Sequence, residues 1–290
     1  MTLDRRGKAM DRKDAWTRLC TLLAVLVLAT GCSAGEPEAP AGEGSVGLAD
    51  YELEGEPVEI EGVRTNLSGV TYVPETKTLW AVMNGPTDLL ELGLDGTVLR
   101  RLPLAGGWDT EGIAWMGDGK LAVAEEGAQV VYIFPVPDED AEIVDLSEAE
   151  HVRVIEGHGR NTGLEGVAHD PEGKRLFGVR EKPPAAYEAQ LPAEGRPLDE
   201  AEARKRFDCD EDTVDISDAA GCCYDEKSGH LLIVSDESAC VVECTLDGEE
   251  VSRLELMAPQ AEGVTLAPDG TLYVVSEPNL LYVYKPKEPE

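Results

Sequence analysis

The sequence predicts an all-β protein, a β-propeller with five blades. Two observations lead to this fold class: one hairpin pattern occurs five times, and its copies are spaced 42 to 55 residues apart. Four short antiparallel strands repeated at such a period are typical of propeller blades. A single four-stranded sheet cannot bury both faces, whereas sheets packed face to face around an axis do. A two-sheet sandwich would not repeat one motif so regularly.

Each repeat begins with a short strand that contains a glycine. The five starts are NLSGVTY (66–72), DTEGIAW (109–115), GLEGVAH (163–169), DAAGCCY (218–224) and QAEGVTL (260–266). Each start leads into a turn, such as GDGK or PDGT, and a second run rich in branched and aromatic residues, such as LWAV or LYVV. Third runs follow at 88–92, 130–134, 241–246 and 280–284, and fourth runs at 98–104, 151–155 and 251–256. These runs supply the strands of the blades.

The two ends of the repeat array predict how the ring closes. The last repeat lacks a fourth strand, and a spare strand precedes the first repeat at 51–62. We therefore expect the N-terminal strand to complete the last blade. The main insertion is 185–214, in which LDEAEARKRF predicts a short helical turn over one mouth of the ring. A sixth blade would require a further copy hidden in this insertion.

The first fifty residues predict export and anchoring. Residues 1–18 are rich in Lys and Arg, and the run Leu19–Ala29 is too short to cross a membrane as a helix. LATGC then places Cys32 after small residues, as in a bacterial lipobox. The expected organisation is a lipoprotein signal peptide (1–31), an acylated Cys32 with a flexible tether (32–50) and the propeller (51–290). The alternative is an ordinary signal peptide with a chance cysteine.

The net charge of −33 limits the partners. Nucleic acid is excluded as a default partner, because phosphate binding requires Lys and Arg. An anionic membrane surface is also repelled, so lipid rather than a basic patch should hold the protein there. We expect a monomer in the bacterial cell envelope, a membrane-anchored lipoprotein that faces the periplasm or the exterior.

Acidic residues recur at two equivalent positions of the hairpin. One position directly precedes the glycine and holds Glu111, Glu165 and Glu262 in three repeats. The other follows the second strand and is occupied by Asn84, Glu125, Glu181, Asp236 and Glu277. Both positions are equidistant from the turn, so we expect them to face each other across the hairpin. The expected glutamate pairs are Glu111 with Glu125, Glu165 with Glu181, and Glu262 with Glu277.

This arrangement predicts a metal site. The first strand of every propeller blade lines the central channel, so the acids should converge at one mouth. Facing carboxylates repel each other unless a cation neutralises them, and Ca²⁺ accepts about 6–8 oxygen ligands in irregular geometry. The candidate ligands are Glu111, Glu125, Glu165, Glu181, Asp236, Glu262, Glu277 and Asn84. The alternative is that these acids accept hydrogen bonds from neighbouring blades around a water-filled channel.

Other motifs are weaker. The sequence has no HExxH, no GxSxG and no phosphate-cradling glycine loop, and DCDED (208–212) lacks the glycine and glutamate of an EF-hand. His169 shares its position with Tyr72, Trp115, Tyr224 and Leu266, which predicts a blade-packing residue. Five cysteines follow Cys32, namely Cys209, Cys222, Cys223, Cys240 and Cys244. Their odd number leaves at least one thiol free, and their pairing is open.

Six segments carry a likeness to a known family: NLSGVTY, TEGIAW, GLEGVAHD, GHLLIVSDES, QAEGVTL and LYVVSEPNLLY. Over residues 66–284 the sequence resembles the SdiA-regulated family, also described as calcium-regulated, phytase-like β-propeller proteins. The resemblance implies an exported or membrane-anchored propeller involved in calcium response and homeostasis, with no established reaction. DISDAAGCC departs from the acid–glycine pattern, so the fourth blade is expected to contribute only Asp236.

Two functions follow from these patterns. The first is a non-enzymatic, lipid-anchored, calcium-binding propeller with a protein or small-molecule ligand at one mouth. The second is a calcium-dependent hydrolase, a lactonase or phosphoesterase, in which the cation polarises an oxygen and a carboxylate acts as base. Phosphate substrates require several basic residues near the ion, and only Arg180 and Lys182 lie close in sequence. Whether the protein is an enzyme stays open.

Overall fold

A computed structural model describes residues 44–157, 162–193 and 195–288. The expected signal peptide, Cys32 and most of the tether lie outside the described residues. Within the described ranges the chain forms β-strands and three single-turn 3₁₀ helices, Leu48–Asp50, Leu146–Glu148 and Leu198–Glu200. No helix in these ranges is long and apolar enough to cross a membrane.

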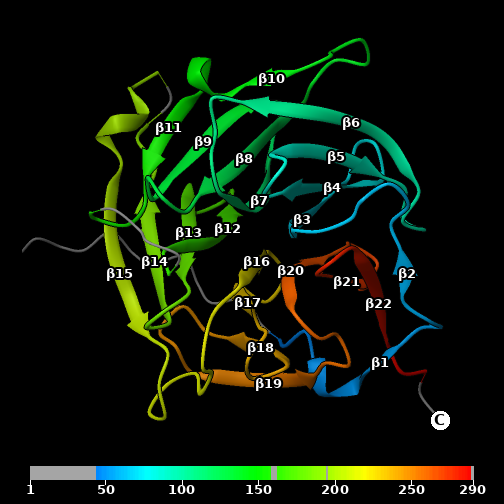
Figure 1. Ribbon diagram of the computed structural model, residues 1–290. Helices are drawn as coiled ribbons and strands as arrows, with labels where there is room; N and C mark the ends of the chain where they lie inside the picture. Colours follow the sequence, from blue (N-terminus) through cyan, green and yellow to red (C-terminus); the bar gives the residue numbers. More distant parts are fainter. Residues whose placement is uncertain (1–43, 158–161, 194, 289–290) are drawn as a thin grey trace, which may run out of the picture. The chain divides into compact units, whose positions relative to one another are not determined.

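Five antiparallel sheets surround a central axis, which confirms the five-bladed propeller (Figure 1). Blade 1 consists of β3 (Leu67–Val73), β4 (Thr78–Met83), β5 (Asp88–Leu92) and β6 (Val98–Ala105), with β10 (Val144–Asp145) added in parallel at its edge. Blade 2 consists of β7 (Thr110–Gly117), β8 (Lys120–Glu125), β9 (Val130–Pro135) and β11 (Glu150–Arg153). Blade 3 consists of β12 (Leu164–Asp170), β13 (Arg175–Arg180), β14 (Ala185–Gln190) and β15 (Glu202–Asp208). Blade 4 consists of β16 (Gly221–Asp225), β17 (His230–Ser235), β18 (Cys240–Cys244) and β19 (Glu250–Glu255).

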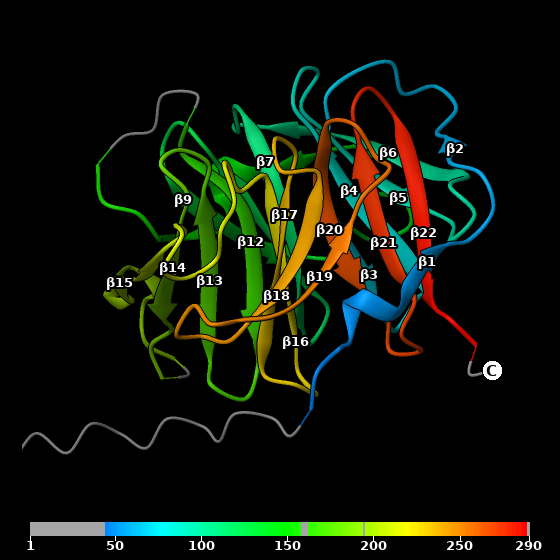
Figure 2. The same ribbon diagram turned by 90° about the horizontal axis from the view of Figure 1, so that it is seen from below.

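The N-terminal strand closes the ring as predicted. Blade 5 consists of β20 (Ala261–Leu266), β21 (Leu272–Ser276), β22 (Leu280–Pro286) and β1 (Tyr51–Leu53), with β2 (Val58–Glu59) also paired to β22. β1 is antiparallel to β22, with Tyr51 opposite Pro286, and the two strands lie side by side in both views (Figure 1, Figure 2). The Tyr51 hydroxyl donates a hydrogen bond of 2.9 Å to the Gly270 carbonyl. Both ends of the domain are therefore held in one sheet.

The predicted helical turn in the insertion is largely wrong. Residues 185–190 form β14 and residues 202–208 form β15, the third and fourth strands of blade 3, and only Leu198–Glu200 forms a 3₁₀ turn. EARKRFD is rich in residues that favour helices, but pairing with β14 along its whole length overrides that local preference. The segment therefore completes a blade, and its described residues, 185–193 and 195–214, form no sixth copy.

Apolar side chains fill the interfaces between the blades. One buried cluster lies at each of the five interfaces. Alternation along β4 shows how a central strand serves two of them: Trp80 and Val82 join the cluster shared with blade 2, while Leu79 and Ala81 join the cluster shared with blade 5. A strand that is buried on both faces therefore has a continuous run of apolar residues in the sequence. The five cysteines of the described chain are free thiols.

The glycines of the first strands allow the blades to meet at the axis. A Cβ atom on Gly112 would lie 2.7 Å from the Glu165 carbonyl oxygen and 2.8 Å from the Val167 nitrogen of the next blade. Each equivalent glycine likewise lies against the next backbone in the ring: Gly69, Gly112, Gly166, Gly221 and Gly263. The innermost strands thus approach backbone to backbone, and the residue before each glycine is fixed beside the axis.

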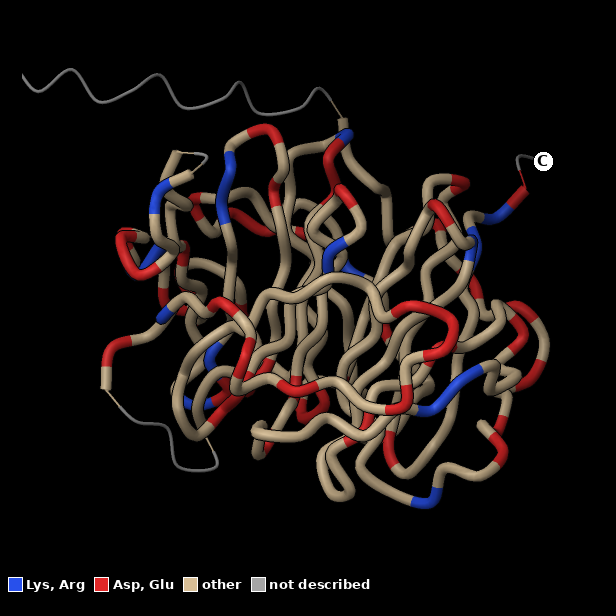
Figure 3. Tube along the Cα trace, turned by 90° about the horizontal axis from the view of Figure 1, so that it is seen from above, with Lys and Arg blue, Asp and Glu red and all other residues tan. Residues whose placement is uncertain are grey.

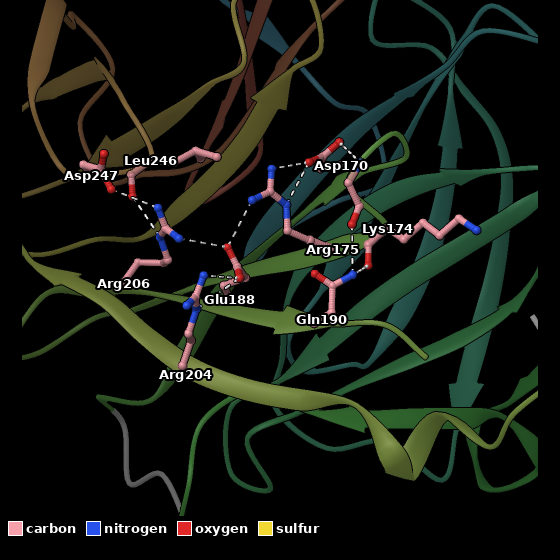
Figure 4. Close-up of polar contacts among 10 residues, drawn as sticks. Asp170, Lys174, Arg175, Glu188, Gln190, Arg204, Arg206, Leu246 and Asp247 are labelled. Carbon is pink, nitrogen blue, oxygen red and sulfur yellow. Dashed lines mark hydrogen bonds and ion pairs between the residues drawn. The ribbon is translucent and has the colours of Figure 1, made fainter. Parts of the chain in front are cut away.

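An ionic network centred on the buried Glu188 of blade 3 reaches the exposed Asp247 of blade 4 (Figure 4). Arg175 bonds Asp170 at 2.6 Å and lies 3.4 Å from Glu188, which is 3 % exposed. Arg206 lies 3.5 Å from Glu188 and 3.0 Å from Asp247 in the turn between β18 and β19. The carboxylate of Glu188 is surrounded by arginines, so its charge is neutralised where water is excluded.

Candidate metal centre

A cavity of about 300 Å³ opens at the end of the channel where the first strands begin. It is lined by Ser68, Asn84, Asp109, Glu111, Glu126, Glu165, Glu181, Lys182, Asp218, Ala220, Asp236, Glu237, Glu262 and Glu277. We call this end the acidic mouth. The acidic excess of the described residues is visible as a predominance of red over blue along the trace in Figure 3.

The glutamates do not pair as the sequence predicted. Glu125 lies opposite Thr110, and the ladder shifts register between Thr110 and Ile113. The same shift occurs between Leu164 and Gly166 and between Ala261 and Gly263. Glu111, Glu165 and Glu262 are therefore extra residues at β-bulges. A bulge re-aims the side chain of the extra residue, and here all three line the acidic mouth.

The prediction for Glu125 is off by one residue. Glu125 is buried, its negative charge adds to burial in raising the pKa of Tyr132, and it does not line the acidic mouth. Its neighbour Glu126 does line it, and the Glu126 N–H donates to the Asp109 carbonyl at 3.0 Å. The error arises because β8 includes Glu125 as its last residue, so the position after the strand is Glu126.

Two groups of carboxylates come close enough to share an ion. Asp109, Glu111 and Glu126 each offer an oxygen, and these oxygens lie within 4.8 Å of one another. Glu126, Glu165 and Glu181 form a second such group. Glu126 belongs to both, so it links the two groups. Asp236, Glu262 and Glu277 line the same cavity outside these two groups.

Asp109 was missed because it precedes the strand. It occupies a position shared with Asn66 and Gln260, and all three have left-handed backbones with φ of 57°, 58° and 54° in chain order. In each case the carbonyl oxygen accepts the N–H of the residue that follows the second strand. The position three residues before each glycine, polar in four of the five repeats, is the signal that could have identified it.

Asn84 and the fourth blade add polar contacts to the acidic mouth. The Asn84 side-chain amide donates to Asp109 at 2.8 Å and to Glu111 at 2.5 Å, so it bridges two carboxylates. Asp218 accepts hydrogen bonds from the Ser235 hydroxyl and, at 3.1 Å, from the Glu237 N–H. The fourth repeat therefore supplies two carboxylates besides Asp236, namely Asp218 and Glu237, contrary to the expectation.

Burial and mutual repulsion favour the protonated acids. Burial raises the pKa of Glu165 to about 11, and the negative charges of neighbouring glutamates add to the shift. The pKa of Glu111 rises to about 7 and that of Glu262 to about 8, in both cases mainly because of burial. The pKa of Glu126 is also raised by burial. A bound cation would remove this repulsion and favour the ionised forms.

The class of protein follows from these features: a five-bladed β-propeller whose central channel has an acidic mouth. More narrowly, the chain belongs to the SdiA-regulated family, whose family model matches residues 43–285. This confirms the resemblance found in the sequence.

Solved structures share the fold. A calcium-binding protein, regucalcin from Agrobacterium tumefaciens, matches with a TM-score of 0.52 and 17 % identity over 80 % of this chain and 93 % of that chain. A luciferin-regenerating enzyme matches with a TM-score of 0.52 and 14 % identity over 79 % of this chain and 95 % of that chain. At these identities the likeness concerns the propeller fold.

Proposed function

We propose that the protein is a calcium-binding propeller that holds Ca²⁺ at its acidic mouth. The observation that carries the proposal is the pair of carboxylate groups that share Glu126. The residues that would hold the ion are Asp109, Glu111, Glu126, Glu165 and Glu181. In this proposal calcium supplies the positive charge that the local sequence lacks.

The donor set fits this ion. Every candidate ligand is a carboxylate, and Ca²⁺ prefers hard oxygen donors in flexible geometry, whereas Mg²⁺ demands near-ideal octahedral geometry. Among the described residues that line the acidic mouth there is no histidine or cysteine, which zinc and copper sites favour. The calcium binding named for the structurally similar regucalcin also supports the proposal.

A non-enzymatic role fits the chemistry of the acidic mouth best. Among the described lining residues Lys182 alone is basic, and its Nζ lies 2.7 Å from Glu237 and 3.5 Å from Glu181. A phosphoester substrate would find little positive charge beyond the ion itself. The proposed role is therefore calcium response or homeostasis, or calcium-dependent binding of a ligand.

Calcium titration of the purified protein tests the proposal. Calorimetry should detect binding, and the melting temperature should rise in calcium relative to chelator. Glu126→Gln should weaken affinity by about tenfold or more, because it removes a charged ligand shared by both groups. Glu125→Gln is the matched control, since this neighbouring glutamate points away from the acidic mouth, and it should retain wild-type affinity. Absence of both heat and a thermal shift would sink the proposal, and turnover of a lactone or phosphoester panel would favour the enzyme.

The cellular location is part of the same proposal. The basic start, the apolar run and Cys32 support a lipid anchor in the cell envelope. Cys32→Ser should release the protein from the membrane fraction, and mass spectrometry of the mature N-terminus should find an acylated cysteine in the wild type. An unmodified N-terminus elsewhere in the chain would contradict the anchor.

A further inference from the structure

The opposite end of the channel holds a second cavity, of about 260 Å³. It is lined by the residues three positions after each first-strand glycine: Tyr72, Trp115, His169, Tyr224 and Leu266. The sequence suggested that this column packs between blades. Tyr72, Trp115, Tyr224 and Leu266 do pack against the buried clusters between blades. All five side chains are also partly exposed and line one cavity. We call this end the aromatic mouth.

The glycine ring separates the two mouths. Between them the channel offers only about 10 Å³, lined by the five glycines and residues next to them. A single water molecule needs about that much room. The aromatic mouth is therefore a blind pocket, and a molecule bound there does not contact the carboxylates of the acidic mouth.

The pocket is held in shape before any ligand arrives. The Tyr224 ring stacks on Phe177 with centroids 5.5 Å apart. The backbone N–H of Trp115 donates to the Thr71 hydroxyl at 2.9 Å, and the backbone N–H of Tyr72 donates to the Thr265 hydroxyl at 3.0 Å. These bonds join the backbones of two ring-bearing residues to the neighbouring blades. Preorganisation of this kind lowers the cost of binding.

The charges at this mouth favour a cation. Asp225 and Glu226 line the pocket beside the rings. Lys227 is the basic residue among the described lining residues, and its Nζ donates to the Pro268 carbonyl at 2.9 Å. Burial lowers the pKa of His169, so the imidazole is neutral near pH 7 and does not repel a cation.

We propose that the aromatic mouth binds a small organic cation of the quaternary ammonium or alkylamine class. The faces of aromatic rings attract cations, and weakly hydrated organic cations gain most because they lose little solvation on entering an apolar pocket. A strongly hydrated inorganic ion would instead require several oxygen ligands, as at the acidic mouth. The negative charges of Asp225 and Glu226 in the pocket lining repel anions.

The volume of the pocket limits the size of the ligand that it can hold. This volume of about 260 Å³ lies just below the range for drug-sized ligand sites, roughly 300–1,000 Å³, so a smaller ligand is expected. A trimethylammonium group with a short substituent fits this scale. Choline and tetramethylammonium are therefore suitable probes.

The decisive comparison uses choline and its uncharged isostere, in which a tert-butyl group replaces the trimethylammonium group. Both are titrated into the full-length protein in saturating calcium, with calorimetry and tryptophan fluorescence as readouts. Choline should bind roughly tenfold more tightly than the isostere, because only choline gains the cation–π attraction. Equal or tighter binding of the isostere would refute a cation site, and so would failure of both choline and tetramethylammonium to bind at millimolar concentration.

Variants locate the site. Trp115→Leu and Tyr224→Leu should each lose most of the choline affinity, and Trp108→Leu, which alters a side chain 79 % exposed, should retain it. The calcium affinity and melting temperature of each variant report whether the propeller is intact. Unchanged choline binding by both folded ring variants, or displacement of choline by calcium, would place the cation at the acidic mouth and overturn the proposal.

Discussion

Gly112→Ala tests whether close approach of the blades at the axis holds the propeller together. The new Cβ would lie 2.7 Å from the Glu165 carbonyl oxygen and 2.8 Å from the Val167 nitrogen. These distances are about 0.6–0.7 Å shorter than the 3.4 Å at which ordinary contact begins. Both contacted atoms belong to a backbone and cannot rotate away, so blades 2 and 3 must separate. Overpacking of this kind costs about 1–3 kcal/mol, which corresponds to a fall in melting temperature of roughly 2–12 °C for a domain of this size.

Gly127→Ala is the matched control for this experiment. Gly127 belongs to the same blade, a Cβ atom added to it would meet nothing within 4 Å, and its φ is not positive. Alanine there should leave the melting temperature unchanged or raise it slightly, since it restricts the unfolded chain. Thermal unfolding followed by circular dichroism in chelator and in calcium measures both variants. Equal melting temperatures for Gly112→Ala and the wild type would refute the close-approach reasoning.

Three further predictions concern stability. The pKa of Glu165 is raised above its unfolded value of about 4.3, so the folded protein binds more protons than the unfolded chain, and its stability without calcium should fall as pH rises from about 5 to 8. Calcium should stabilise the protein more at the higher pH. A rise in melting temperature over that range in chelator would contradict this prediction. Glu188→Gln leaves arginines buried without their shared carboxylate, so it should lower the free energy of unfolding, measured by chemical denaturation, by about 3–5 kcal/mol. Glu250→Gln, which alters a partly exposed ion pair, should lower it by less than about 1 kcal/mol. Similar losses for the two variants would be evidence against the network around Glu188. Tyr51→Ala removes a buried ring from β1 and should lower the free energy of unfolding by about 3–5 kcal/mol. Limited proteolysis should then cleave blade 5 earlier than in the wild type. Unchanged protease resistance would argue against a role of Tyr51 in ring closure.

The repeat pattern was sufficient to predict the architecture. Glycines at one position of each first strand are required where backbones meet at the axis, so they mark every blade. The fourth strand of blade 3 was missed because the residues of β15 are mostly exposed and include Arg, Lys, Glu and Ala, which favour helices. Pairing with β14 decides their conformation, and that partner is defined only in the folded protein.

The acidic mouth was predictable as a cluster but not residue by residue. Alignment brought Glu165 and Glu181 to one end of the channel, where the structure places them. It selected Glu125 instead of Glu126 because side chains alternate along a strand, so an error of one residue at the end of β8 reverses the direction of the side chain. The bulges that turn the first-strand glutamates toward the channel leave no mark in composition or spacing.

Ring closure through β1 and β22 determines the order of assembly. Each of the first four blades forms from hairpins that are local in sequence, which is the rapid kind of contact. The fifth blade must bring Tyr51–Leu53 to Leu280–Pro286 across more than two hundred residues. During synthesis β1 therefore stays unpaired until β22 has been made. The apolar faces of blades 1 and 4 that pack against blade 5 stay exposed until then. The interval before closure is the stage at which the chain is most exposed to aggregation.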